Sequence, residues 1–336
     1  MRLSILDQSP IADGMSAAAA LANSVSLARA GDRLGYHRYW AAEHHASPAL
    51  AGAAPEVLLA AAGAVTARIR LGSGGIMLPH YSPFKVAETF STLAGLFPGR
   101  VDLGVGRAPG SDGRTAFALQ RDRRQAAPND FPNQLAELLG YLEDDLPAGH
   151  PFADLARTLP GRPEVPDVWL LGSSPDSAAW AAETGLPYCF ADFINGDGAG
   201  IAADYRRTFR PGARGDRPTT MVALWTVCAE TDAAAERLAL SSRMMLAHLL
   251  QGVLIPVPSP ETAAAWLAAN PHAGVRPGRR MIAGSPATVR AGIEAAVAEY
   301  GADEAMLVTI VHDHAARLRS YELIAEVFAS ETRLAA

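Results

Sequence analysis

The feature that most constrains this fold is a regular alternation of short β-type segments with longer helical segments along the 336 residues. Such alternation favours parallel strands joined by crossover helices, and eight strands are the number that closes an α/β barrel. We therefore expect a (β/α)8 TIM barrel that spans residues 1–336 as a single domain. The expected strands are Leu3–Leu6, Tyr39–Glu43, Ile69–Ile76, Val101–Val105, Val168–Leu171, Tyr188–Ala191, Met221–Cys228 and Ala305–Val311.

Two stretches are too long for this repeat: Pro109–Pro166 after the fourth strand and Thr231–Gly284 after the seventh. We interpret both as insertions. Each follows the carboxyl end of a strand, where barrel enzymes keep their active sites, so both are candidates for pocket walls. For the second insertion, a purely structural role is an equally good interpretation.

Charge and hydropathy exclude several classes of partner. A net charge of −6 without a basic run lacks the positive surface that a nucleic-acid binder needs. The longest apolar stretch, Ala49–Ala67, contains Pro55 and Glu56, which indicates a buried helix and not a membrane span. The first residues lack a signal-peptide pattern, and the only cysteines are Cys189 and Cys228. We expect a cytoplasmic protein with no nucleic-acid or membrane partner.

An open dinucleotide-binding sheet is the alternative architecture. It would carry G-x-G-x-x-G after an early strand. The glycines of Gly104–Gly110 have a different spacing, and no G-K-[ST] sequence follows any glycine cluster. The barrel is therefore favoured.

A turn rich in hydroxyl groups, Leu171–Ser177, ends the fifth strand and opens a helix. A helix start presents free N–H groups and a partial positive charge, which together favour anions. Arg107, at the end of the fourth strand, can add a positive charge from the neighbouring strand. Ordinary capping by Ser174 is the alternative, but capping needs one hydroxyl and this turn has three. The predicted phosphate site consists of Arg107, Gly172, Ser173, Ser174 and Ser177.

The third strand loses its side chains in its second half, at Ser73-Gly74-Gly75. Glycine weakens a strand unless another group must approach the backbone closely. The flat ring of a cofactor is one such group, and a β-bulge inside the barrel is the other explanation. The sequence supports the two equally.

Two histidine clusters follow strands, His44-His45 after Glu43 and His312-Asp313-His314 after the eighth strand. Neighbouring residues on a strand face opposite ways, so at most one of His44 and His45 is expected to point into a pocket. In the second cluster, Asp313 is well placed to cap a helix, with surface histidines beside it. Together the clusters leave open a metal-dependent barrel hydrolase, although such enzymes usually carry H-x-H on the first strand.

Six motifs, in order along the chain, match one known family. They are Leu6–Pro10, Gly35–His45, Gly72–His80, Val101–Gly110, Leu170–Ser174 and Thr309–His314. Through this ordered set the chain resembles the bacterial-luciferase-like flavin-dependent monooxygenases, in their short single-subunit branch.

The resemblance implies that reduced FMN at the barrel mouth and dioxygen oxygenate a small organic substrate, with no metal. It assigns His44 and His45 to the catalytic pocket and places Gly74-Gly75, joined by a cis peptide, under the flavin ring. It also puts Arg107, Ser173, Ser174 and Ser177 at the flavin phosphate, in agreement with the interpretation of the turn above.

Some positions depart from luciferase itself. Gly106 stands where luciferase has a cysteine, and the arginines of the first insertion do not match luciferase's own segment. Light emission is therefore in doubt, and we expect a different substrate pocket. Asp192, at the end of the sixth strand, is expected at that pocket. The arginines of the first insertion that do not match luciferase's segment are Arg114, Arg121, Arg123 and Arg124.

Two further interpretations stay open. Relatives on this barrel use the deazaflavin coenzyme for hydride transfer, and a non-catalytic flavin-binding protein would carry the same motifs. Because the chain shows no dinucleotide motif, we expect a separate reductase to supply the reduced flavin. The resemblance also implies a homodimer formed through the helices after the second and third strands.

Overall fold

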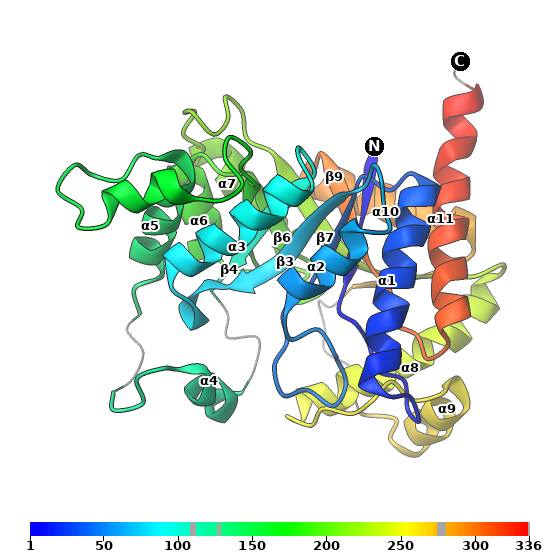
Figure 1. Ribbon diagram of the computed structural model, residues 1–336. Coiled ribbons are helices and arrows are strands. Elements are labelled where there is room, and N and C mark those ends of the chain that lie inside the picture. Colours follow the sequence, from blue (N-terminus) through cyan, green and yellow to red (C-terminus); the bar gives the residue numbers. More distant parts are fainter. Residues whose placement is uncertain (108–111, 126–128, 274–279, 335–336) are drawn as a thin grey trace.

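The computed structural model describes residues 1–107, 112–125, 129–273 and 280–334. Eight parallel strands close into a barrel with helices around it, which confirms the expected (β/α)8 fold (Figure 1). Neighbours pair in order from β1 to β7, then β7 pairs with β9 and β9 with β1. The barrel strands are β1 (Arg2–Asp7), β2 (Arg38–Ala41), β3 (Arg70–Met77), β4 (Val101–Gly106), β5 (Asp167–Gly172), β6 (Tyr188–Ala191), β7 (Thr220–Cys228) and β9 (Glu304–Val308).

The helices start where the sequence places proline and cap residues. Pro83, Pro175 and Pro286 each occupy the first turn of a helix, where the missing N–H costs nothing. The helices are α1 (Ala17–Leu34), α2 (Pro55–Gly63), α3 (Pro83–Leu96), α4 (Gly113–Leu119), α5 (Phe131–Glu143), α6 (Pro175–Thr184), α7 (Ala199–Thr208), α8 (Asp232–Leu250), α9 (Pro260–Ala269), α10 (Pro286–Tyr300) and α11 (His314–Leu334), with 3-10 turns η1 (Leu78–His80) and η2 (Ala153–Thr158). None of the helices in the described ranges is long and apolar enough to cross a membrane.

Two strands end earlier than their sequence indicates. β2 stops at Ala41 and not at Glu43, because its neighbour β1 ends at Asp7, the partner of Ala41. The His44 N–H then bonds to the Gly52 carbonyl instead of to a strand. β9 stops at Val308 and not at Val311, and the next N–H donates to the Tyr321 hydroxyl.

The second predicted insertion, Thr231–Gly284, needs a correction. It contains α8 and α9 but ends in a ninth strand, β8 (Met281–Gly284). β8 pairs with Trp225–Cys228, the second half of β7, whereas β6 pairs with the first half. β7 is longer than β6, so its exposed edge needs another partner. A strand of four residues leaves little periodic signal, and the sequence did not reveal it.

Parts of both insertions lie at the carboxyl end of the barrel. β1 begins at the N-terminus, which marks the amino end of the barrel. In Figure 1, α4, α8 and α9 lie at the opposite end. The first insertion holds α4, α5 and η2, and its predicted first residue, Pro109, lies outside the described residues. α4 buries none of its residues, whereas the buried face of α5 includes Leu135 and Leu138.

The core has two main layers. The larger one fills the space between strands and helices, and the smaller one fills the barrel. Inside the barrel, Trp40 and Trp169 meet edge to face, with ring centroids 5.6 Å apart, and Met221 and Met306 pack against them. The barrel is therefore a packed interior and not a pore, and function is restricted to its ends.

Candidate functional site

The two adjacent histidines after β2 have different surroundings. The Nε2 atom of His45 lies 2.6 Å from Oε1 of Glu43, while the ring nitrogen Nδ1 of His44 is buried without a partner. Residues two apart in an extended segment share a side, so Glu43 can meet His45 and not His44. The alternation of side chains along this segment therefore places the His45 ring against the Glu43 carboxylate and turns the His44 ring away from it.

His44 is held in its neutral form. Burial, together with the neighbouring His45, lowers the pKa of His44 from 6.5 to about 4. At neutral pH the ring is uncharged, so one nitrogen can donate a hydrogen bond and the other can accept one. Such a group can hold or move a proton beside a bound molecule.

Glu43 is a residue of this site that the sequence analysis did not assign. Its carboxylate is fully buried and accepts hydrogen bonds from the Met77 N–H and the Tyr81 hydroxyl, both at 2.9 Å. Both partners follow the glycine-rich half of β3. One sequence feature could have identified Glu43: it directly precedes the histidine pair at the end of an apolar strand. A carboxylate in such a buried place is rarely without hydrogen-bond partners.

The glycine-rich half of β3 is tightly packed. The pairing with β4 shifts its register between Gly74 and Ile76, as a β-bulge or a similar irregularity does. A Cβ atom at Gly74 would lie 2.4 Å from the Leu6 side chain, and one at Gly75 would lie 2.8 Å from the Gly104 carbonyl oxygen. The Gly74-Gly75 peptide bond is cis, as the resemblance implied. Packing thus accounts for these glycines, and the place of a ring beside them stays a prediction.

Arg107 reaches the start of α6. Its guanidinium stacks 5.2 Å above the Trp180 ring, and Nη1 lies 3.3 Å from the Asp176 carboxylate. Trp180 and Asp176 both belong to α6. The arginine after β4 and the helix start after β5 therefore lie together in space, as the predicted phosphate site requires.

The start of α6 is not capped by a side chain. Ser174 is the residue before the helix, yet its hydroxyl makes no capping hydrogen bond, so ordinary capping is wrong for this turn. The first N–H groups of a helix have no partner within the helix. The Ser173 carbonyl accepts a hydrogen bond from the Asn195 side chain after β6, which helps to fix the turn.

Ser177 and Gly172 pack against each other. The Ser177 hydroxyl is buried and bonds to the Ser174 carbonyl at 2.8 Å and the Tyr188 hydroxyl at 3.0 Å. A Cβ atom at Gly172 would lie 2.2 Å from that hydroxyl oxygen. The Ser177 hydroxyl already has protein partners, so its backbone N–H is the group left to meet an anion.

In the second histidine cluster the predicted cap is confirmed, but His314 is not a plain surface group, because its Nε2 atom is buried without a partner among the described residues. Asp313 caps α11 by accepting from the Ala316 N–H at 3.0 Å. Across the described ranges, no three histidine, cysteine or acidic side chains are grouped in a way that could hold a metal ion. Asp192 accepts a hydrogen bond from the Tyr300 hydroxyl of α10 at 2.9 Å, and its place at the pocket stays a prediction.

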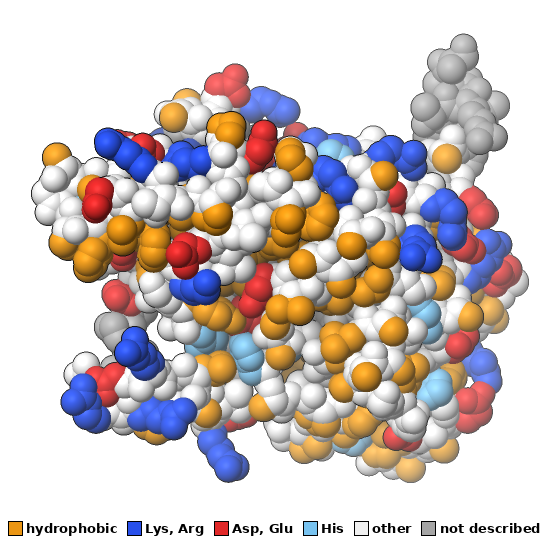
Figure 2. Space-filling model, in the orientation of Figure 1, with side chains coloured by type: hydrophobic (Ala, Val, Ile, Leu, Met, Phe, Trp, Pro, Cys, Tyr) orange, Lys and Arg blue, Asp and Glu red, His pale blue; other side chains and the backbone are white. Residues whose placement is uncertain are grey.

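The arginines of the first insertion form a separate basic patch. Figure 2 shows arginine side chains around α4, next to a hollow at which histidine side chains are visible. In this patch Arg124 pairs with Asp122 at 2.8 Å, and Arg123 donates to the Ala118 carbonyl.

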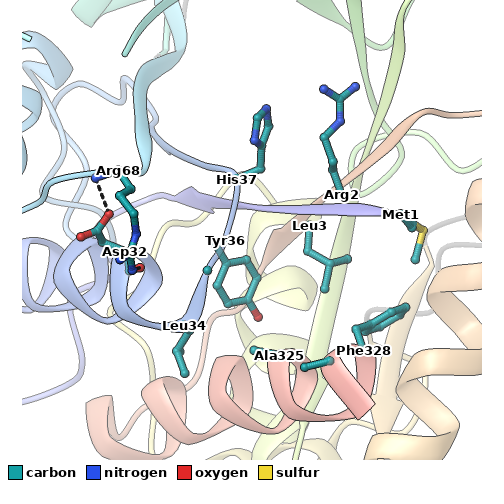
Figure 3. Close-up of a pocket in the computed structure, with 12 residues that line it drawn as sticks. Met1, Arg2, Leu3, Asp32, Leu34, Tyr36, His37, Arg68, Ala325 and Phe328 are labelled. Atoms are coloured by element: carbon teal, nitrogen blue, oxygen red, sulfur yellow. Dashed lines mark hydrogen bonds between the residues drawn. The ribbon is translucent and has the colours of Figure 1, made fainter. Parts of the chain in front are cut away.

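A hollow of about 460 Å³ lies at the other end of the barrel (Figure 3). Arg2 and Leu3 at the start of β1 line it, together with Tyr36 and with Phe328 of α11. In Figure 3 its Arg68 is hydrogen-bonded to Asp32, which fixes the segment before β3. This hollow is at the amino end, away from His44 and Arg107, so we do not count it as the active site.

The amino-acid sequence is similar to those of luciferase-like monooxygenases. The family model for luciferase-like monooxygenases matches residues 1–304. A luciferase-like monooxygenase of Escherichia coli is 41% identical, with 96% of each chain covered. An N-acetyl-S-alkylcysteine monooxygenase of Bacillus subtilis is 37% identical over 99% of this chain and all of that protein.

Solved structures show the same likeness. Apo-MsnO8 superposes with a TM-score of 0.87 at 39% identity and covers 98% of this chain and 97% of its own. An FMN complex of the oxygenating constituent of 3,6-diketocamphane monooxygenase from Pseudomonas putida gives 0.72 at 20% identity, with 97% of each chain covered. An F420-dependent secondary alcohol dehydrogenase gives 0.64 at 15%, with 97% of this chain and 98% of its own covered. The last two share the fold alone.

Proposed function

Because this chain belongs to the luciferase-like monooxygenase family, we propose that it uses reduced FMN and dioxygen to oxygenate a small organic substrate. The observation that carries this proposal is the Arg107 guanidinium beside the uncapped start of α6. Family membership also removes the support for a metal-dependent hydrolase.

The residues present fit a flavin phosphate. Free N–H groups at the first turn of α6 and a cation held by stacking on Trp180 are the groups that bind phosphate in proteins. We assign the phosphate to Arg107, Ser173, Ser174 and the N–H groups near Gly172 and Ser177. The Asp176 carboxylate contacts the guanidinium at one nitrogen and leaves its other donors available.

Bound reduced flavin would supply the two electrons with which one oxygen atom of O2 enters the substrate and the other leaves as water. The chain binds and orients the reactants and excludes water from them. His44, neutral and partly buried, holds or moves a proton at its ring nitrogens. We assign Gly74 and Gly75 to the rim of the ring site, since they lie at the same carboxyl end of the barrel as His44.

The first test is to titrate the protein with FMN and with reduced FMN, and then to follow oxygen-dependent product formation. N-acetyl-S-methylcysteine is a rational first probe, because one relative is an N-acetyl-S-alkylcysteine monooxygenase. His44→Ala should depress turnover while FMN affinity stays close to that of the wild type. Full turnover in this variant would remove His44 from the mechanism, and reduced FMN that consumes oxygen without any product would indicate a flavin-binding protein only.

We propose that a separate reductase supplies the reduced flavin. The support is the lack of a dinucleotide motif after any glycine cluster of the chain. NADH or NADPH alone should leave bound FMN oxidised, and adding a flavin reductase should start turnover. Rapid bleaching of FMN by either nucleotide without a reductase would contradict this.

The deazaflavin coenzyme is the second candidate. One solved structure with this fold is an F420-dependent dehydrogenase, but its likeness to this chain is limited to the fold. Because the two coenzymes absorb at different wavelengths, spectra of the protein saturated with each one distinguish them. Tighter binding of the deazaflavin, with hydride transfer and no oxygen uptake, would replace the FMN assignment.

We also propose that the protein is a homodimer formed through α2 and α3. Val57 on α2 and Leu96 on α3 keep 67% and 62% of their surface exposed, which is high for large apolar side chains. Analytical ultracentrifugation should give twice the chain mass, and Val57→Asp should shift the equilibrium towards the monomer. A monomeric wild type at micromolar concentration would contradict it.

A further inference from the structure

We propose that Glu43 is the positioning residue of the two-histidine site: its buried carboxylate fixes His45 as the tautomer that carries hydrogen on Nε2. The tautomer is a property of the protein alone, and only its effect on turnover rests on the proposed function.

The Glu43 carboxylate connects two strand ends. It lies just after β2, is 0% exposed, and both of its oxygen atoms are used. Oε2 accepts the Met77 N–H, and Oε1 accepts both the Tyr81 hydroxyl and Nε2 of His45. A buried carboxylate with three donors is well compensated, and removing its charge would leave those donors without an acceptor.

These donors can only donate in this arrangement. The Met77 N–H is a fixed donor, and burial together with the Glu43 charge raises the pKa of Tyr81 far above its ordinary value, so the hydroxyl keeps its hydrogen. An ionised carboxylate has no hydrogen to give. The hydrogen of the 2.6 Å contact therefore belongs to Nε2 of His45, and in the neutral ring the lone pair belongs to Nδ1.

His44 receives no such direction from a carboxylate. Within the part of the chain that the structure describes, no side-chain hydrogen bond involves its ring, and its buried Nδ1 lacks a partner. The charged or titratable groups around the pair are Glu43, Tyr81, His80 and Glu56. His80 meets the His45 ring edge to face at 5.7 Å, while burial and the Glu43 charge raise the pKa of Glu56. All of them adjoin Glu43 or His45, so the carboxylate organises one histidine and leaves the other for a ligand.

The variant Glu43→Gln keeps the shape of the side chain but turns Oε1, the acceptor shared by Tyr81 and His45, into a donor. A glutamine has a single acceptor oxygen, and the Met77 N–H can only be met by that oxygen. The amide nitrogen then faces His45, which can bond to it only if Nε2 is the acceptor. Exchange of an orienting carboxylate for an amide should thus move the hydrogen to Nδ1.

Nitrogen NMR of protein labelled with ¹⁵N-histidine reports the tautomer directly, without flavin or substrate. The wild type should show His45, assigned by its loss in His45→Gln, with hydrogen on Nε2. Glu43→Gln should show it on Nδ1. Tyr81→Phe is the matched control, because it removes a donor to the same oxygen but keeps the carboxylate, and it should retain the Nε2 tautomer.

A wild-type His45 with hydrogen on Nδ1 would overturn the proposal, and so would a folded Glu43→Gln protein that keeps the Nε2 tautomer. If Glu43→Gln fails to fold, the wild-type spectrum and Glu43→Asp, which should keep the Nε2 tautomer, still decide the question. A switch of tautomer in Glu43→Asp would also count against it.

The functional consequence is measured separately. In Glu43→Gln we expect kcat to fall by about tenfold or more, with FMN affinity within about threefold of the wild type. An unchanged kcat with a switched tautomer would show that His45 orientation does not matter to the reaction. If no flavin binds at all, the proposed function fails while the tautomer result stands.

Discussion

The Arg38 cluster at the amino end of the barrel and the His44 and Arg107 side chains at the carboxyl end differ in how far their polar atoms are paired. At the amino end, buried Arg38 bonds to Glu304 at 2.7 Å and to Asp102 at 2.8 Å, and Ser4 and Trp40 donate to the same two carboxylates. At the carboxyl end, within the described residues, His44 has a buried nitrogen without a partner, and Arg107 has one longer ion pair, with Asp176, besides its stacking on Trp180.

We infer that the paired cluster stabilises the fold, whereas the unpaired groups are available to a ligand. A closed network of buried charges holds strands together and offers nothing to a ligand, since each donor already has an acceptor. Unpaired donors and a neutral imidazole cost stability and persist where a ligand can use them. The four predictions below test this contrast from the largest expected effect to the smallest.

Removing the arginine of the amino-end network should have the largest effect. Arg38→Met leaves Asp102 and Glu304 buried with less compensation, which should lower the free energy of unfolding by about 3 to 5 kcal/mol. Urea unfolding measures it. Arg33→Met, which breaks an exposed pair with Glu322, is the matched control and should cost less than about 1 kcal/mol. Equal losses in both variants would mean that the network is not structural.

Acid should destabilise the carboxyl end through His44. When folded, His44 stays neutral down to about pH 4, whereas the unfolded chain protonates it near 6.5. The unfolded state binds the extra proton between these values, so stability is lost as the pH falls from about 6.5 to about 4, by about 3 kcal/mol. Urea unfolding at pH 7 and pH 4 should show this extra loss in the wild type and not in His44→Gln. Parallel losses in both proteins would refute the assignment.

Arg107 should matter to ligand binding and little to folding. Arg107→Gln removes the cation at α6, and we expect FMN affinity to fall about tenfold to a hundredfold, or about 1.5 to 3 kcal/mol. The unfolding free energy should change by less than about 0.5 kcal/mol. Fluorescence titration with FMN measures the affinity, and Arg124→Gln in the basic patch serves as the control. A variant that binds FMN normally would remove Arg107 from the site.

Ser177 should behave in the reverse way. Ser177→Ala removes a hydroxyl that bridges the Ser174 carbonyl and the Tyr188 hydroxyl, so the free energy of unfolding should fall by about 1 kcal/mol. FMN affinity should stay within a few-fold of the wild type, because the N–H is retained. An affinity loss as large as that of Arg107→Gln would show that the hydroxyl binds phosphate directly.

Much of the fold was predictable because its signals are local. The helix starts at Pro83 and Pro175 follow from the fixed φ of proline. The barrel followed from counting alternating segments, and the eight strand positions agree with the structure except at their ends. The sequence did not predict β8, because this strand forms only by pairing with the second half of β7. The shorter β6 leaves that part of β7 without a partner.

The candidate site was only partly predictable. The sequence brought forward His44, His45, Arg107 and the serine turn, since each follows a strand end. It could not show that Ser177 bonds to Tyr188, because that contact depends on how α6 packs on β6. For the same reason it could not show that Ser174 leaves α6 uncapped.

The sequence by itself determined the barrel, the strands after which its insertions come and the family to which the chain belongs. Only the tertiary structure decided which of two adjacent histidines is paired. The Glu43 carboxylate is fixed by Met77 at the end of β3 and by Tyr81 shortly after it, and these residues meet Glu43 only when β2 and β3 lie side by side. Local sequence dictates which elements form, whereas the partners of a buried charge depend on elements brought together by folding.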